Sequence, residues 1–180
     1  PANVTDMQSA FDSCSNLVNA PIIPANVIDL GSVFRDCIKL SNVPNMTQAI
    51  SVKNMGCTFW NCTNLVNAPA MPDNATNMSQ TFIDCTNLAN APIIPANVTN
   101  MYGTFWNCTN LTGDIKITSN RISNAAMANC FRNTSKTKNV YIPFTGYNSV
   151  ANTHNAATNA TYGISGKNGV TIYDINTYTG

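Results

Sequence analysis

The sequence contains no glutamate and little charge of either sign. Only 9% of its 180 residues are charged, and the formal net charge at pH 7 is +1. Nucleic acids and anionic membranes are attracted by clustered lysine and arginine, and a chain this close to neutrality offers them no field. No apolar run approaches the roughly 18 residues of a membrane span. We therefore expect no nucleic-acid partner and no direct membrane insertion.

The usual groups of a catalytic or metal site are equally scarce. His154 is the only histidine, and no cysteine or serine stands at a motif spacing that suggests a catalytic dyad. Most of the seven cysteines are a whole repeat apart, whereas zinc sites use close pairs such as C-x-x-C. We predict no enzymatic activity, no metal site and no cofactor.

What the sequence does contain is an internal repeat. Five segments align with a period of 23 residues, once stretched to 25, and they begin at Asn3, Asn26, Ser51, Asn74 and Asn97. A cysteine marks the same phase in each: Cys14, Cys37, Cys62, Cys85 and Cys108. A degenerate sixth copy is predicted to place Cys130 in that phase, with Met127 in the slot of Phe105. A fixed period of roughly 20–50 residues indicates a solenoid of stacked units.

Within each copy the apolar residues recur with helical spacing. In the fourth copy Ala75, Met78, Phe82 and Cys85 stand at steps of 3, 4 and 3, which puts them on one face of a short helix. The column of Asp6, Asp29, Asn54, Asn77 and Asn100 is then interpreted as helix caps. The cysteines are predicted to form a column of buried thiols behind the phenylalanines. Cys57 lies outside that phase, so we expect either an exposed free thiol or one within disulfide reach of a neighbour.

A short strand is predicted on the other side of each coil. The segment around Ile115 and Ile117 buries both isoleucines only if Lys116 points outward. By alignment, four further residues point inward: Ile23, Met46, Met71 and Ile94. A proline at the start of each strand limits the ladder to two or three residues, and these prolines are Pro21, Pro44, Pro69 and Pro92.

These patterns predict an α/β fold. It is a right-handed solenoid of about six coils, and each coil is one short strand and one short helix that must stack to bury its apolar face. We assign residues 1–143 to the solenoid and residues 144–180 to a C-terminal cap of the same domain. The cap is expected to contain a helix near 150–160 and a strand at 169–173. The first residues already belong to a repeat unit, which suggests a piece of a larger protein.

The repeat phrase P-x-N-V-T-N-M-x-x-T-F-x-N-C-T-N-L-x-N-A-P resembles the BspA-like leucine-rich repeat of surface proteins of bacteria and some mucosal protozoa. It is also similar to a short repeat of mycoplasma-type surface lipoproteins. The resemblance covers roughly residues 1–143. It implies a leucine-rich-repeat solenoid, display at the cell surface or secretion, and adhesion or protein binding. It implies no particular ligand, because repeat families share a scaffold while their binding residues vary.

Two surfaces are candidates for partner binding. Trp60, Ile83 and Trp106 occupy one slot in three successive copies, and Tyr102 is expected to join them in an apolar column on the flank of the solenoid. The same residues could equally shield the groove beside a neighbouring coil. The second candidate is the outward side of the strands, where we expect Ile22, Ile93, Lys116 and Tyr141 to face a partner.

The function predicted from the sequence is recognition or adhesion outside the cell. The partner would be a host or neighbouring protein, or a glycan, bound through one face of the solenoid. The alternative is a structural or virion component, such as a phage fibre domain or a self-associating filament subunit, for which low charge and an apolar flank suit repeated contacts.

Overall fold

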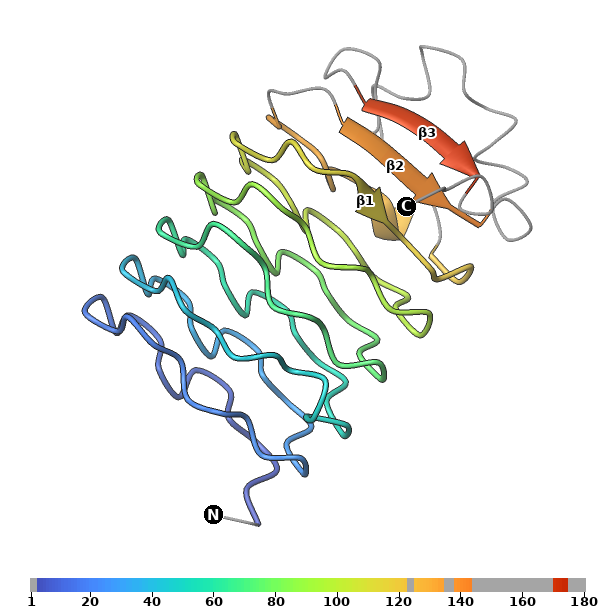
Figure 1. The fold of residues 1–180 in the computed structure, drawn as a ribbon. Coiled ribbons are helices and arrows are strands. Elements are labelled where there is room, and N and C mark those ends of the chain that lie inside the picture. The colour runs from blue at the N-terminus through green and yellow to red at the C-terminus, as the bar shows by residue number, and fades with distance from the viewer. Residues whose placement is uncertain (1–2, 123–124, 135–137, 144–169, 175–180) are drawn as a thin grey trace.

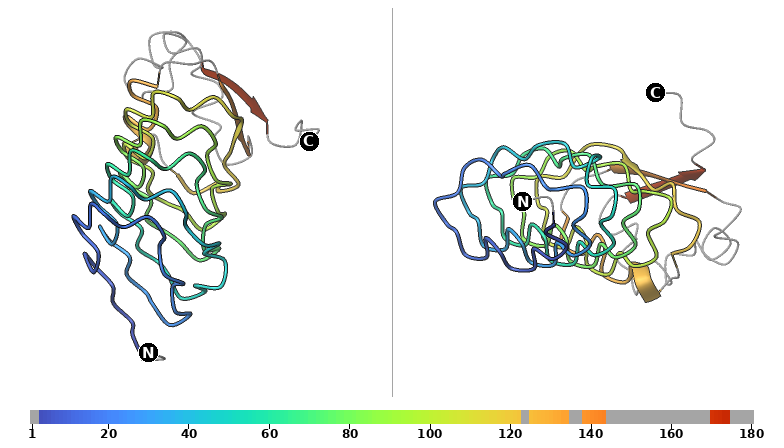
Figure 2. Two further views of the ribbon diagram at one scale, coloured as in Figure 1. Left: turned by 60° about the vertical axis from the view of Figure 1, so that its left-hand side comes forward. Right: turned by 90° about the horizontal axis from the view of Figure 1, so that it is seen from below.

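The repeats stack side by side along one axis (Figure 1). The computed structural model describes residues 3–122, 125–134, 138–143 and 170–174. The N-terminus lies at one end of the stack, and the views in Figure 2 show the same elongated shape from two further sides. A repeat solenoid is therefore the architecture of this chain.

Regular secondary structure is confined to the C-terminal part of the described residues. Three strands form one parallel sheet in the order β1-β2-β3, with a 3₁₀ helix, η1, between the first two. Their bounds are β1 Ile115–Lys116, η1 Ala125–Met127, β2 Lys138–Ile142 and β3 Val170–Asp174. The predicted strand at 169–173 is confirmed as β3, whose Ile172 pairs with Val140 of β2. The helix expected near 150–160 lies outside the described residues.

A stack of phenylalanine rings runs through the centre of the solenoid. Neighbouring ring centroids lie 5.4–5.8 Å apart with interplanar angles of 1–16°. The rings belong to Phe11, Phe34, Phe59, Phe82, Phe105 and Phe131. Columns of methionine, leucine and cysteine flank them in one continuous core. Equal intervals along the chain therefore become neighbouring layers of one hydrophobic spine.

The prediction of a helix in each repeat is wrong for the described residues, in which no α-helix forms. In the fourth copy the amides of Met78, Gln80, Phe82 and Asp84 donate to carbonyls of the next layer over 2.7–2.9 Å. Between them, the amides of Thr81 and Ile83 donate to carbonyls three residues back, as in turns, and not four back as in an α-helix. Each layer is thus held by its neighbours through a wall of consecutive turns.

Left-handed residues explain why these turns do not continue as a helix. Two positions of each repeat have φ near +60°, and in the fourth copy they are Gln80 (57°) and Asp84 (60°). A right-handed helix does not tolerate such residues. The fifth copy has Gly103 at the first position, and the second is Asp or Asn in most copies. Both choices suit this conformation, since glycine lacks Cβ and Asn and Asp tolerate it better than other residues.

The predicted alignment of the sixth copy is also wrong. The ring of Phe131 stacks on Phe105, and the amide of Phe105 donates to the carbonyl of Cys130. Cys130 therefore occupies the slot of Thr104. The slot that the sequence predicts for Cys130 is occupied by Thr134. The interval here is 26 residues, the separation of Phe105 and Phe131.

The strand side of the earlier repeats carries only a thin ladder. Isolated parallel bridges join Asn19 to Asn42, Asn67 to Asn90, and Ile94 to Ile117. This confirms the short ladders predicted from the prolines. The inward positions are also confirmed, because Ile23, Met46, Met71, Ile94 and Ile117 are all buried.

Candidate functional site

The thiol column is an architectural feature of the core. Cys37, Cys62, Cys85 and Cys108 are buried and form no disulfide, and each Sγ donates to a phenylalanine carbonyl of the preceding layer over 3.0–3.1 Å. The predicted column is thus confirmed for these four residues. Cys14, in the first layer, is exposed.

Burial makes these thiols poor nucleophiles. It raises the pKa of Cys37 to about 11 and the pKa of Cys85 well above its ordinary value. A nucleophilic cysteine needs the opposite shift, toward the thiolate. Cys57 is a free, half-buried thiol whose Sγ lies 3.7 Å from Oε1 of Gln80, and burial raises its pKa as well.

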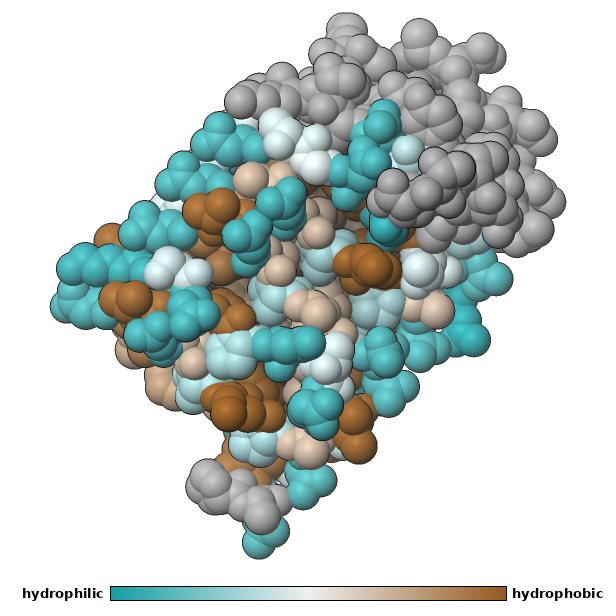
Figure 3. All heavy atoms as spheres, in the orientation of Figure 1, coloured by the Kyte–Doolittle hydropathy of each residue, from teal (hydrophilic) through white to brown (hydrophobic). Residues whose placement is uncertain are grey.

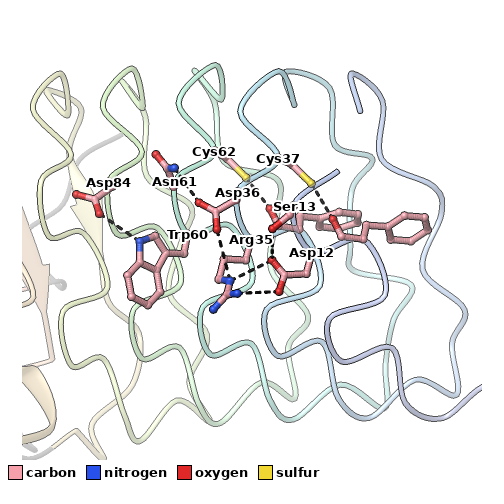
Figure 4. Close-up of polar contacts among 11 residues, drawn as sticks. Asp12, Ser13, Arg35, Asp36, Cys37, Trp60, Asn61, Cys62 and Asp84 are labelled. Atoms are coloured by element: carbon pink, nitrogen blue, oxygen red, sulfur yellow. Dashed lines mark hydrogen bonds and ion pairs between the residues drawn. The ribbon is translucent and has the colours of Figure 1, made fainter. Parts of the chain in front are cut away.

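The flank column has one residue per layer, and each of these residues follows a stacked phenylalanine in the sequence. Figure 4 shows Trp60 of this column, with Arg35 and Asp12 in the same slot of the two preceding layers. Trp60 and Trp106 are half-buried, whereas Ile83, which occupies the same slot between them, is only 6% exposed. Trp60 Nε1 donates to Asp84 over 3.2 Å. The guanidinium of Arg132 lies 4.4 Å from the centroid of the Trp106 ring, so a cation–π contact covers one face of that ring.

The same column begins with charged residues. Arg35 forms an ion pair of 2.9 Å with Asp12 in the layer below and lies 3.6 Å from its neighbour Asp36. Tyr102 is 36% exposed, and its hydroxyl accepts a hydrogen bond of 3.3 Å from Asn129. The polar atoms of this flank are therefore largely occupied by neighbouring layers.

Asparagine ladders join the layers at other corners. Asn61 donates to Asp36 over 2.8 Å, and Asn107 donates to Asp84 over 2.7 Å. In the column predicted as helix caps, the carboxylate or amide oxygen accepts from the amide two residues on, as for Asn77 and Ser79 over 3.0 Å. That contact caps a turn and not a helix.

The strand face exposes apolar residues instead. Ile22 is 78% exposed and Ile93 is 57% exposed. Lys116 of β1 and Tyr141 of β2 pair with each other in the sheet register and are half-buried. In the space-filling view of Figure 3, apolar residues on the surface lie in small groups separated by polar ones. Ile22 and Ile93 are thus more open to a partner than Ile83 of the flank column.

Two hollows meet at Ile93. The first has a volume of about 480 Å³. Its lining comes from four successive layers: Thr47, Ala70, Met71, Asp73, Ile93, Pro95, Ala96, Asn97 and Thr118. The second has a volume of about 350 Å³ and is more polar, with Asp114 and Lys116 in its wall. The sequence did not reveal the hollows, because their walls are turn residues whose alignment along the stack depends on the three-dimensional path of the chain.

The described residues contain neither a cluster of metal ligands nor a membrane-spanning helix. No group of three or more His, Cys, Asp or Glu side chains is placed to hold a metal ion. No helix in the part of the chain that the structure describes is long and apolar enough to cross a membrane.

Comparison with known proteins places the chain among leucine-rich repeats. The BspA type leucine rich repeat region family matches residues 32–159 in six copies. Among solved structures, the fold is similar to that of the T. pallidum leucine rich repeat protein TpLRR, with a TM-score of 0.56 and 17% identity over 84% of this chain and 80% of that one. No curated protein matches the sequence. The family match spans well over half of the sequence, and the chain therefore belongs to the BspA-type leucine-rich repeat family.

Proposed function

We propose that this chain is a recognition domain that binds a partner protein through its strand face. Its family indicates a repeat protein involved in protein binding or adhesion, and such repeats are typically not enzymes. The observation that carries the choice of face is the exposure of Ile93 between two hollows. Exposed apolar groups beside concave surface are typical of interfaces on otherwise polar proteins.

The flank column is the weaker of the two candidate surfaces. Ile83 is buried, and the layers on either side already occupy the indole nitrogen of Trp60 and one ring face of Trp106. A partner binding there would gain little new apolar burial. On the strand face Ile22, Ile93, Lys116 and Tyr141 are the residues that we propose contact the partner.

The remaining details of the fold and setting are part of the same proposal. The solenoid is right-handed with about six coils, residues 1–143 form it, and residues 144–180 cap it. The six matched copies support the coil count, although the match runs on to residue 159, and the pairing of β3 with β2 supports a cap that continues the sheet. We place the domain at the cell surface or outside the cell, because the resemblance is to surface proteins.

A peptide library tests the choice of face. Peptides selected from a random phage-displayed library on the immobilised protein are expected to lose about tenfold in affinity for Ile93→Asn, since truncating a central interface residue costs more than about 1 kcal/mol. Affinity is measured by titration with synthetic copies of the selected peptides. Ile38→Asn is the matched control, because Ile38 is exposed at 40% and lies in a different column.

The proposal fails if Ile93→Asn and Ile38→Asn bind the peptides equally well. It also fails if binding depends on Trp60 and Trp106, tested as Trp60→Ser and Trp106→Ser, and not on Ile93. The second result would move the site to the flank column.

A further inference from the structure

The first hollow beside Ile93 combines apolar walls with one carboxylate. Met71 and Pro95 line the hollow and are otherwise buried. Ile93 is 57% exposed, and Asp73 is also exposed. Asp73 is the only ionisable side chain among the described residues that line it. The hollow therefore suits a group that is apolar along its length and cationic at its end.

No described residue forms an ion pair with the carboxylate of Asp73. Within the described residues both ion pairs are made by Arg35, which reaches Asp12 and Asp36. The backbone carbonyl of Asp73 accepts a hydrogen bond of 3.1 Å from the side-chain amide of Asn97. An apolar side chain of the partner would remove water from this carboxylate without supplying a charge or hydrogen bond in its place. An acidic side chain would be repelled.

We propose that this hollow receives a lysine or arginine side chain of the partner. The methylene stem lies against Met71, Ile93 and Pro95, and the cationic head pairs with Asp73. Long basic side chains bury their stems on apolar surface in this way while their charge stays at the rim. The inference rests on the proposed strand-face function and adds the chemistry that the face selects.

Two short peptides test the proposal directly. Acetyl-Gly-Lys-Gly-amide and its norleucine counterpart, acetyl-Gly-Nle-Gly-amide, share an apolar stem but only the first carries a cation. Binding is followed by NMR of the methionine methyl groups, because Met71 lines the hollow. The lysine peptide is expected to shift the Met71 methyl signal and to bind about two- to fivefold more tightly than the norleucine peptide, as for an exposed ion pair.

Variants of Asp73 provide the control. Asp73→Asn should bring the affinity for the lysine peptide down to that for norleucine, and Asp73→Glu should restore part of it. The proposal is overturned if Asp73→Asn leaves lysine binding unchanged, if norleucine binds as well as lysine, or if neither peptide shifts Met71. The choice of the strand face is judged separately by Ile93→Asn with the selected library peptides, so the two ideas can fail independently.

Discussion

Replacing Phe82 by alanine is expected to lower the free energy of unfolding by about 3–5 kcal/mol, as for other buried phenylalanines. Phe82 is fully buried and stacks on Phe59 at 5.4 Å and on Phe105 at 5.6 Å. Its removal leaves a cavity between two layers and breaks two ring contacts. Because each layer is stabilised only by its neighbours, the loss interrupts the spine in its middle. Urea unfolding followed by circular dichroism measures the change.

The same substitution at the end of the stack is the matched control. Phe11 is half-buried and stacks on one ring, that of Phe34, among the described residues. Phe11→Ala should therefore cost less than half as much as Phe82→Ala. Equal losses of unfolding free energy at the two positions would contradict the account of a continuous spine. So would a loss below about 1 kcal/mol for Phe82→Ala, because so small a loss is typical of surface substitutions.

The stability of the protein is expected to fall steeply above pH 9. Burial raises the pKa of Cys37 to about 11 and raises the pKa of Cys62 and Cys85 well above the ordinary value, whereas an unfolded thiol ionises at about 8.5. A raised folded-state pKa contributes stability that is fully present below the unfolded pKa. That stability is lost as the pH rises toward the folded pKa, because only the unfolded chain then releases the proton.

The thiol part of this effect can be isolated by a double variant. Cys62→Ser/Cys85→Ser keeps a donor for the phenylalanine carbonyls. The chain already has a buried hydroxyl in this slot at Thr134, whose Oγ1 donates to Phe131 of its own layer over 2.8 Å. Between pH 9 and 10 the free energy of unfolding should fall more steeply for the wild-type protein than for the double variant. The difference is about 1.4 kcal/mol per pH unit for each of the two replaced thiols. Urea midpoints at pH 8, 9 and 10 give the two slopes, and parallel slopes would show that the thiols ionise freely in the folded protein.

The sequence predicted the layering because burial repeats at a fixed interval. The phase of the cysteines from Cys37 to Cys108, the inward Ile23 and Ile94, and the short strand ladders all follow from alternation and period, and the structure confirms them. Family membership follows from the same pattern. These features depend on which side chains are apolar and hardly on the local path of the backbone.

The helix was wrongly predicted because turns can produce the same spacing. Steps of 3 and 4 between Met78, Phe82 and Cys85 place side chains inward in a run of turns as well as in a helix. The contrary signal was Gly103, together with the recurrent Asp or Asn at the position of Asp84, which are residues that tolerate positive φ. Their recurrence at fixed positions is typical of turns.

In the sixth copy the cysteine phase predicts the wrong alignment, because Cys130 occupies the slot of Thr104. The segment Phe131-Arg132-Asn133 is identical to Phe105-Trp106-Asn107 at two of its three positions, and Asn129 and Asn133 have the positive φ of their counterparts. The candidate site was predictable only in part. The exposure of Ile22 and Ile93 follows from alternation, but the hollow beside Asp73 depends on turns from four layers that no sequence pattern relates.

The central claim is that the segment before each cysteine is a wall of turns hydrogen-bonded between layers. The stability of Gln80→Gly relative to Gln80→Ala tests it most directly, because Gln80 has φ of 57°. In a wall of turns the glycine variant should be more stable by about 1 kcal/mol, since left-handed backbone penalises Cβ. A helix would reverse the order by about the same amount, with alanine the more stable, and that result in urea unfolding would contradict the account.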